Sequence, residues 1–258
     1  MLRMKLQIFV IIQIFTFICA LYFLDESLIL SALLLLCSGL FMNFSLHITI
    51  HHFVHFKYRN RLNNLLFECL YTLNLGLPFN FYQMQHFNHH RYDNRIGDFT
   101  STWILKKDKI VPKVLFRYAF MWWVPSGVNM IKKSESEGYL SQKEKKNLLP
   151  QLILIVVFYA FLALMNPWYC LMYAMMVYTG WSLISFTNYG QHLPRKYGEE
   201  FTYSYSGKWY NFFFFNNGLH HEHHKEPHLD YKDLNNSEVN SLSIPHLFAG
   251  IFKGGVVK

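Results

Sequence analysis

Long uncharged apolar runs are the dominant pattern along the chain. Four such runs occur in two pairs, and a short polar break divides each pair. A hydrocarbon core of about 30 Å requires about 20 apolar residues in a helix. The pattern therefore predicts four membrane-spanning helices in two hairpins, at about 6–24, 28–50, 148–165 and 168–188.

The composition narrows the class of protein further. The 258 residues are 52% apolar and 19% aromatic, and only 16% are charged, against about a quarter in soluble domains. This apolar excess argues against both a soluble globule and a disordered chain. The four cysteines are scattered through apolar stretches without framework spacing, which excludes a disulfide scaffold. An integral membrane protein remains.

The positions of the basic residues predict its orientation. Lys and Arg are absent from 6–56 and from 147–194, so both tight connections can face outward while every basic residue lies inside. Both termini and the polar segments 57–147 and 192–258 are then cytoplasmic. The net charge of +8 follows from this sidedness and from attraction to anionic lipid. No nucleic-acid recognition motif occurs.

The predicted fold is thus an all-α integral membrane protein, a single domain over 1–258, with a cytoplasmic helical cap. The chain has 14 histidines, and most of them lie in or next to this predicted cap. All but His246 fall into four groups, and each group lies at or beyond the cytoplasmic end of a predicted span. The groups are His47, His51, His52 and His55; His86, His89 and His90; His192; and His220, His221, His223, His224 and His228.

Their spacing is typical of metal ligands. Residues at i, i+3 and i+4 share one helix face, so HxxxH and HxxHH patterns direct two or three imidazoles at one point. Neutral imidazole is a common metal ligand and needs no buried charge. Nine histidines suit two metal ions with open positions, although imidazole alone leaves the element undetermined. The nine are His47, His51, His86, His89, His90, His192, His220, His223 and His224.

Three motifs in this order resemble the histidine boxes of the membrane fatty acid desaturase and hydroxylase superfamily. They are HxxxHH from His47, HxxHH from His86 and HHEHH from His220, with HHRYDNRIGDFTSTW after the second box and NYGQH before the third. The resemblance covers about residues 28–230. The order and spacing of the motifs and the predicted topology are similar to those of bacterial members. It implies a location in the bacterial inner membrane, with the active site on the cytoplasmic side.

The resemblance implies two non-haem iron ions that activate O2 for attack on an unactivated C–H bond. Electrons would arrive singly from a ferredoxin, a rubredoxin or a cytochrome b5. Carried over by position, the nine histidines match the ligands of the three boxes and the additional ligand before the third. Other residues are candidates for extra ligands or for partners of the ligands; they are His52, His55, Asn188, His221, Glu222, Asp93 and Asp98.

The spacing of the first box allows more than one choice of ligands. His52 is the alternative to His51, and His55 shares a face with both. Acidic side chains at Asp93, Asp98 and Glu222 could accept the spare N–H of ligating imidazoles.

The expected function is an oxidoreductase that desaturates a long acyl chain at the membrane. The same site could instead serve a hydroxylase, ketolase, acetylenase or oxidative decarboxylase acting on a fatty acid, an alkane or a carotenoid. A metal transporter is disfavoured because the middle of the predicted spans carries no Asp or Glu.

Overall fold

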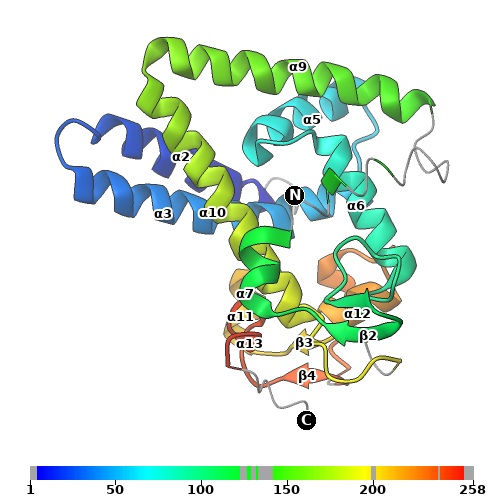
Figure 1. Ribbon diagram of the computed structural model, residues 1–258. Coiled ribbons are helices and arrows are strands. Elements are labelled where there is room, and N and C mark those ends of the chain that lie inside the picture. The colour runs from blue at the N-terminus through cyan, green and yellow to red at the C-terminus, as the bar shows by residue number, and fades with distance from the viewer. Residues whose placement is uncertain are drawn as a thin grey trace. The chain divides into compact units, whose positions relative to one another are not determined.

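The computed structural model describes residues 5–122, 127–128, 132, 142–198, 202–237 and 239–252. It divides into two compact units, and Figure 1 labels their elements. The predicted cytoplasmic segment 57–147 lies partly outside the described residues. The first unit comprises Met1–Met84 and Glu137–Trp181, and the second comprises Gln85–Ser136 and Ser182–Lys258.

The described part of the first unit is helical. Two of its helices, α6 and α10, continue into the second unit. The elements are α2 (Ile8–Tyr22), α3 (Leu28–Phe44), the π-helix η1 (Ser45–Ile50), α4 (His51–His55), α5 (Arg61–Leu75), α6 (Phe79–Tyr92), α9 (Gln142–Met165) and α10 (Pro167–Gln191).

Among the described residues, three helical stretches are long and apolar enough to cross a membrane. They are Leu28–His55, Leu148–Met165 and Pro167–Gln191. The first extends beyond the predicted 28–50 because α3, η1 and α4 follow one another without a break. The run predicted at 6–24 forms α2, whose 15 residues are fewer than a full span requires. The predicted break at Asn166 and Pro167 separates α9 from α10.

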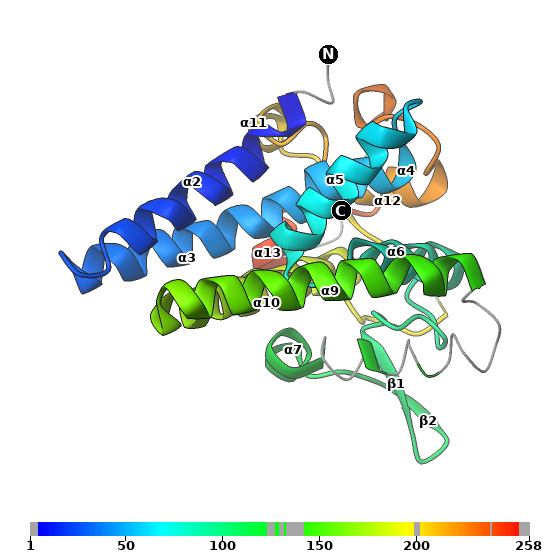
Figure 2. The same cartoon turned by 90° about the horizontal axis from the view of Figure 1, so that it is seen from above.

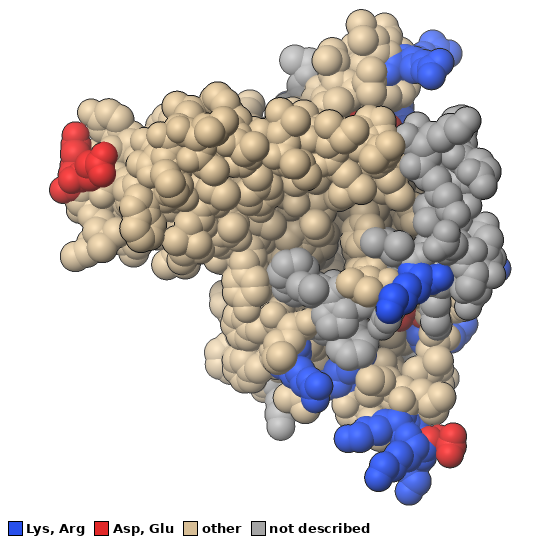
Figure 3. All heavy atoms as spheres, turned by 45° about the horizontal axis from the view of Figure 1, so that its top comes forward, with Lys and Arg blue, Asp and Glu red and all other residues tan. Residues whose placement is uncertain are grey.

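The first unit presents apolar side chains outward. Ile11, Phe15 and Ile18 on α2 are more than half exposed, and Val156 and Leu164 on α9 likewise. Figure 3 shows a broad surface over these helices almost without charged residues. Exposed apolar surface of this extent is stable only against lipid or another protein, which agrees with a membrane protein.

Small polar residues bring α2 and α3 together, and the two helices lie side by side in Figures 1 and 2. Ser31 Oγ donates to the carbonyl of Ala20 at 2.7 Å, and Ser38 Oγ donates to the carbonyl of Gln13 at 2.9 Å. Small residues allow such close approach, and the bonds satisfy the hydroxyls where water is excluded.

Side chains from other helices cap the C-terminal end of α5. A helix ends with carbonyls that lack intrahelical partners, and in an apolar interior those carbonyls need other donors. The carbonyl of Leu75 accepts from Trp181 Nε1 at 3.0 Å, and the carbonyl of Leu73 accepts from the Tyr173 hydroxyl. Gln13 Nε2 donates to the carbonyl of Asn74 at 3.4 Å. The chain can therefore end a helix and turn inside the unit.

Gly76 makes that turn, and a larger residue is expected to destabilise it. Its φ is +64°, and a Cβ there would lie 2.5 Å from Cγ2 of Val177. Gly76→Ala should lower the unfolding free energy by about 2 kcal/mol, because backbone strain and overpacking add. Thermal unfolding in detergent measures this. Gly198→Ala, where φ is +94° but nothing lies within 4 Å, is the matched control; an equal loss in both variants would contradict the packing argument.

The second unit contains shorter elements. Besides the ends of α6 and α10, they are β1 (Trp103–Lys106), β2 (Lys109–Pro112), α7 (Leu115–Arg117), the π-helix η2 (Tyr118–Trp122), β3 (Ser204–Tyr205), α11 (Lys208–Phe213), α12 (His220–Lys225), the 3-10 helix η3 (Tyr231–Asp233), β4 (Ser241–Leu242) and α13 (His246–Ala249). Tyr118, Tyr189, Leu193, Tyr203, Leu242 and Ala249 form its buried core.

The all-α prediction therefore needs a correction. Most of the described chain is helical, but β1 and β2 pair antiparallel, and β3 and β4 pair parallel. The β1–β2 hairpin forms because Trp, Ile, Leu and Val flank the tight turn at Lys107 and Asp108. That turn lacks the Asn-Gly or Asp-Gly pair that signals a hairpin in a sequence.

Candidate metal centre

A complete four-histidine group lies within the second unit. One ligand nitrogen from each ring lies within 4.8 Å of all the others. Three elements supply them, because His89 is on α6, His192 follows the end of α10, and His220 and His224 are one turn apart on α12. We call this set the complete cluster.

The donor atoms of the complete cluster fit a bound cation. His192 Nε2 and His220 Nε2 are 2.9 Å apart, and two imidazole nitrogens bound at about 2.1 Å and at right angles would be about 3 Å apart. Burial lowers the pKa of both rings well below the usual range, with neighbouring histidines adding to the effect. The rings are therefore neutral and keep lone pairs available to a metal ion.

Asp98 orients the ring of His89 through a hydrogen bond at Nδ1, as carboxylates commonly do for metal-binding histidines. Its Nδ1 lies 2.8 Å from Asp98 Oδ2, while its buried Nε2 has no hydrogen-bond partner among the residues that the structure describes. Burial lowers the pKa of His89, but the charge of Asp98 and this hydrogen bond outweigh it and raise the pKa overall. The hydrogen bond to Asp98 keeps a proton at Nδ1, so Nε2 is the atom that would bind a metal ion, which would displace any proton there.

The loop after α6 holds two more members of the complete cluster. Asp93 Oδ1 lies 2.9 Å from Nδ1 of His224. Thr102 Oγ1 and Asn94 Nδ2 donate to the carbonyl of His192 at 2.8 and 3.3 Å. The sequence suggests roles for Asp93 and Asp98 but not for Asn94 and Thr102, because hydrogen bonds to a distant backbone carbonyl leave no spacing pattern in the sequence.

Asp98→Asn is expected to weaken metal binding by about 10- to 100-fold, because residues that orient a ligand have effects of this size. Asp98 is buried and ionised: burial raises its pKa, but His89 and Thr100 lower it overall. Metal retention against a chelator series measures the change. The exposed Asp233→Asn is the control. Equal metal retention in Asp98→Asn and wild type would contradict this role.

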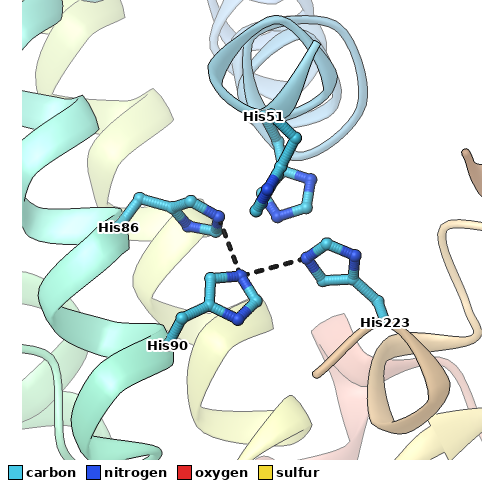
Figure 4. Close-up of side chains that lie close together, drawn as sticks. His51, His86, His90 and His223 are labelled. Carbon is cyan, nitrogen blue, oxygen red and sulfur yellow. Dashed lines mark hydrogen bonds between the residues drawn. The ribbon is translucent and has the colours of Figure 1, made fainter. Parts of the chain in front are cut away.

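A second set of histidines in the same unit converges separately. His90 Nε2 lies 3.0 Å from His86 Nε2 and 3.1 Å from His223 Nε2 (Figure 4). His86 and His90 are one turn apart on α6, and His223 comes from α12. These separations again match neighbouring ligands of one ion. We call these three residues the partial cluster.

Each HxxHH motif therefore divides its histidines between the two clusters. In the second box the i, i+4 pair His86 and His90 belongs to the partial cluster, whereas His89 belongs to the complete one. In the third box the assignment is reversed, since His220 and His224 share the complete cluster and His223 does not. Adjacent helical residues point about 100° apart, so one motif serves two sites. Of the two or three imidazoles that the spacing directs at one point, the structure brings two of each box together and places the third in the other cluster.

The first histidine box lies in the first unit and is built differently. His51 and His55 are on α4, their rings are 5.1 Å apart, and their ligand nitrogens lie within 4.8 Å of each other. His47 lies earlier, inside the π-helix η1. Single π-turns within helices are frequent at functional sites.

The remaining candidates lie outside both clusters. The ring of His52 packs 4.9 Å from that of Phe56, and His221 Nδ1 lies 2.6 Å from Thr202 Oγ1. Glu222 accepts hydrogen bonds from Ser204 and Ser237. His246, the histidine outside the four groups, is fully buried, and its Nε2 lies 2.9 Å from the carbonyl of Tyr203.

Asn188 braces the loop that carries Asp98. Its Nδ2 donates to the Tyr118 hydroxyl at 2.5 Å and to the carbonyl of Thr100 at 3.2 Å. Tyr118 itself donates to that carbonyl at 2.6 Å. Thr100 Oγ1 in turn donates to Asp98 Oδ1 at 2.8 Å. The amide thus supports the loop that orients His89.

Lys113 is a buried amine close to this loop, and its Nζ donates to the carbonyl of Ser101 at 2.5 Å. Burial lowers its pKa from 10.5 to about 7, against the opposing charge of Asp98. Above pH 7 the unfolded chain then binds more protons than the folded chain, so stability rises with pH and is lost as pH falls.

Relative to Lys113→Met, the wild type should gain about 2 kcal/mol of unfolding free energy between about pH 7 and pH 9. Denaturant unfolding of both proteins at several pH values measures the difference. A difference that does not change with pH would contradict a neutral buried amine.

The match with protein families agrees with these clusters. The model of the fatty acid desaturase family matches residues 27–236, which contain every histidine of both clusters and of the first box. Comparison with curated proteins and with solved structures gave no match. The matched region covers most of the 258 residues. The chain therefore belongs to the fatty acid desaturase family.

Proposed function

We propose that this membrane oxidoreductase is an O2-dependent di-iron enzyme that attacks unactivated C–H bonds of a long fatty acyl chain, and that its reaction is desaturation. The observation that carries the proposal is the convergence of imidazoles into two clusters within a member of the fatty acid desaturase family. All-nitrogen donor sets suit iron among other metals, and the family resemblance selects iron.

The complete cluster would hold one iron ion through His89, His192, His220 and His224. The partial cluster would hold the other, with further ligands from the first box. The sequence pattern predicts His47 and His51 for that role. The ring contact between His51 and His55 and the proximity of their nitrogens favour His51 and His55.

Bound iron would supply the activation of O2 and the oxidising power for C–H cleavage. The chain's own residues prepare the site for it. Asp98 holds a proton at Nδ1 of His89, so that Nε2 remains the donor atom, and the carboxylate of Asp93 lies 2.9 Å from Nδ1 of His224. Burial of His192 and His220 excludes water and keeps these two imidazoles neutral. Desaturation balances as O2, two electrons, two protons and two substrate hydrogens giving two waters.

We further propose that both units form one oxidase domain, since the family match extends across both. In this proposal α2 completes a set of four spans, the termini and the active site face the cytoplasm, and the enzyme lies in a bacterial inner membrane. Labelling of a cysteine at Ser27 in oriented membranes tests the sidedness. Labelling from the cytoplasmic side alone would overturn it.

The test of the reaction is anaerobic purification with iron, followed by addition of O2, a reductant and a panel of acyl lipids, alkanes and carotenoids. Product mass identifies the chemistry. Loss of two hydrogens supports desaturation, whereas gain of one oxygen indicates hydroxylation and loss of the carboxyl carbon indicates decarboxylation. The same product yield without O2 would refute an O2-dependent enzyme.

A further inference from the structure

The β1–β2 hairpin of the second unit presents an exposed group of lysines. Lys106, Lys107 and Lys109 are all exposed and are accompanied by only one acidic residue, Asp108. Lys106 and Lys109 are paired across the two strands. Figure 3 shows basic residues gathered in its lower right part, where the hairpin ends. No described element of the proposed iron site uses these side chains.

The turn itself favours other residues. Lys107 and Asp108 have φ values of +47° and +61°, which make a tight turn that prefers Asn and Gly. A lysine is an unfavourable choice at a positive φ, so its presence indicates a use for the charge. Next to the turn, Leu105 and Ile110 form a cross-strand pair and are 55% and 38% exposed. An apolar pair beside a basic tip is a typical docking surface for an acidic protein.

The hairpin also connects directly to residues that hold the complete cluster. β1 begins at Trp103, the residue after Thr102, whose hydroxyl donates to the carbonyl of His192. Asp98, which orients His89, lies five residues before the strand. The backbone NH of Lys113, just after β2, donates to the carbonyl of Thr102 at 2.8 Å. A short covalent and hydrogen-bonded route therefore joins the hairpin to two ligands.

We propose that this hairpin docks an acidic, soluble one-electron carrier protein, an inference that rests on the proposed function. Each encounter oxidises one carrier by one electron, and two encounters supply the two electrons that the reaction consumes. A lipid surface is the less suitable occupant, because none of the exposed side chains of the hairpin is aromatic. The exposed Trp209 and Phe212 are on α11, which lies away from the hairpin in Figures 1 and 2.

The test measures binding of three acidic probes, a [2Fe–2S] ferredoxin, a rubredoxin and the soluble domain of cytochrome b5, to the full chain in zwitterionic nanodiscs. The Lys106→Glu, Lys107→Glu double variant should weaken the dissociation constant of a binding probe by about ten-fold or more at low salt. Asp108→Asn should tighten it. The control reverses two exposed lysines elsewhere in the unit, Lys208→Glu with Lys232→Glu, and should change binding less than about two-fold.

Reduction of the metal-loaded chain gives a second readout. The hairpin variant should be reduced more slowly by the carrier and at an unchanged rate by dithionite. Equal carrier binding in the hairpin variant and the control, or no binding of any probe to the wild type, would overturn the proposal. So would a variant that loses adhesion to phosphatidylserine vesicles but keeps carrier binding. Because binding is measured without turnover, failure of the proposed reaction leaves this result independent.

Discussion

His192→Ala is expected to remove one metal ion per chain and to reduce turnover by more than about 100-fold, since even residues that only orient a ligand cost 10- to 100-fold in metal affinity. His192 is fully buried, and its Nε2 lies 2.9 Å from that of His220. Alanine removes one of the four nitrogen donors of the complete cluster. The measurements are metal content per chain and product formation in the same preparation.

His228→Ala is the matched control, because His228 comes from the same histidine-rich segment but is exposed and belongs to neither cluster. It should keep its full metal content and activity. Unchanged metal content in a folded His192→Ala protein would contradict the assignment of the complete cluster.

The second large effect is expected in the first histidine box. If His51 and His55 are the ligands, His55→Ala should abolish turnover and lower the metal content by one ion, whereas His47→Ala should retain most of both. The reason is geometric, since the ligand nitrogens of His51 and His55 lie within 4.8 Å of each other, and His47 is not among the converging histidines of the described residues. Metal content and product yield of the two variants, prepared in parallel, measure the contrast.

Each of the two variants is the control for the other, because both remove an imidazole from one continuous helical stretch. The reverse result, with His47→Ala inactive and His55→Ala active, would restore the pair that the sequence pattern predicts. It would also reject the assignment that the ring contact favours.

Much of the first unit could be predicted from apolar runs alone. The break between α9 and α10 follows from Asn166 and Pro167, because proline cannot continue a helix from the preceding turn. The end of α5 could not be predicted in this way. It depends on donors from α2 and α10, which contact its last carbonyls only in the folded unit.

The histidine clusters were predictable in kind but not in membership. Spacing at i and i+4 predicts that His86 lies beside His90 and His220 beside His224, and the structure brings the members of each pair together. It could not show that His89 and His223 belong to opposite clusters, because that depends on how α6 and α12 are packed in the second unit. In the first box, His47 and His51 have the same HxxxH spacing as His51 and His55. The sequence did not indicate that His47 lies in a π-helix while His51 and His55 lie in α4.

Iron stoichiometry tests the central claim most directly. Protein purified without oxygen, loaded with iron and freed of excess metal should contain two iron ions per chain, and its activity should rise in proportion to that content. Fully active protein that contains fewer than two iron equivalents, or that works equally well with another metal alone, would contradict a di-iron centre built from these two clusters.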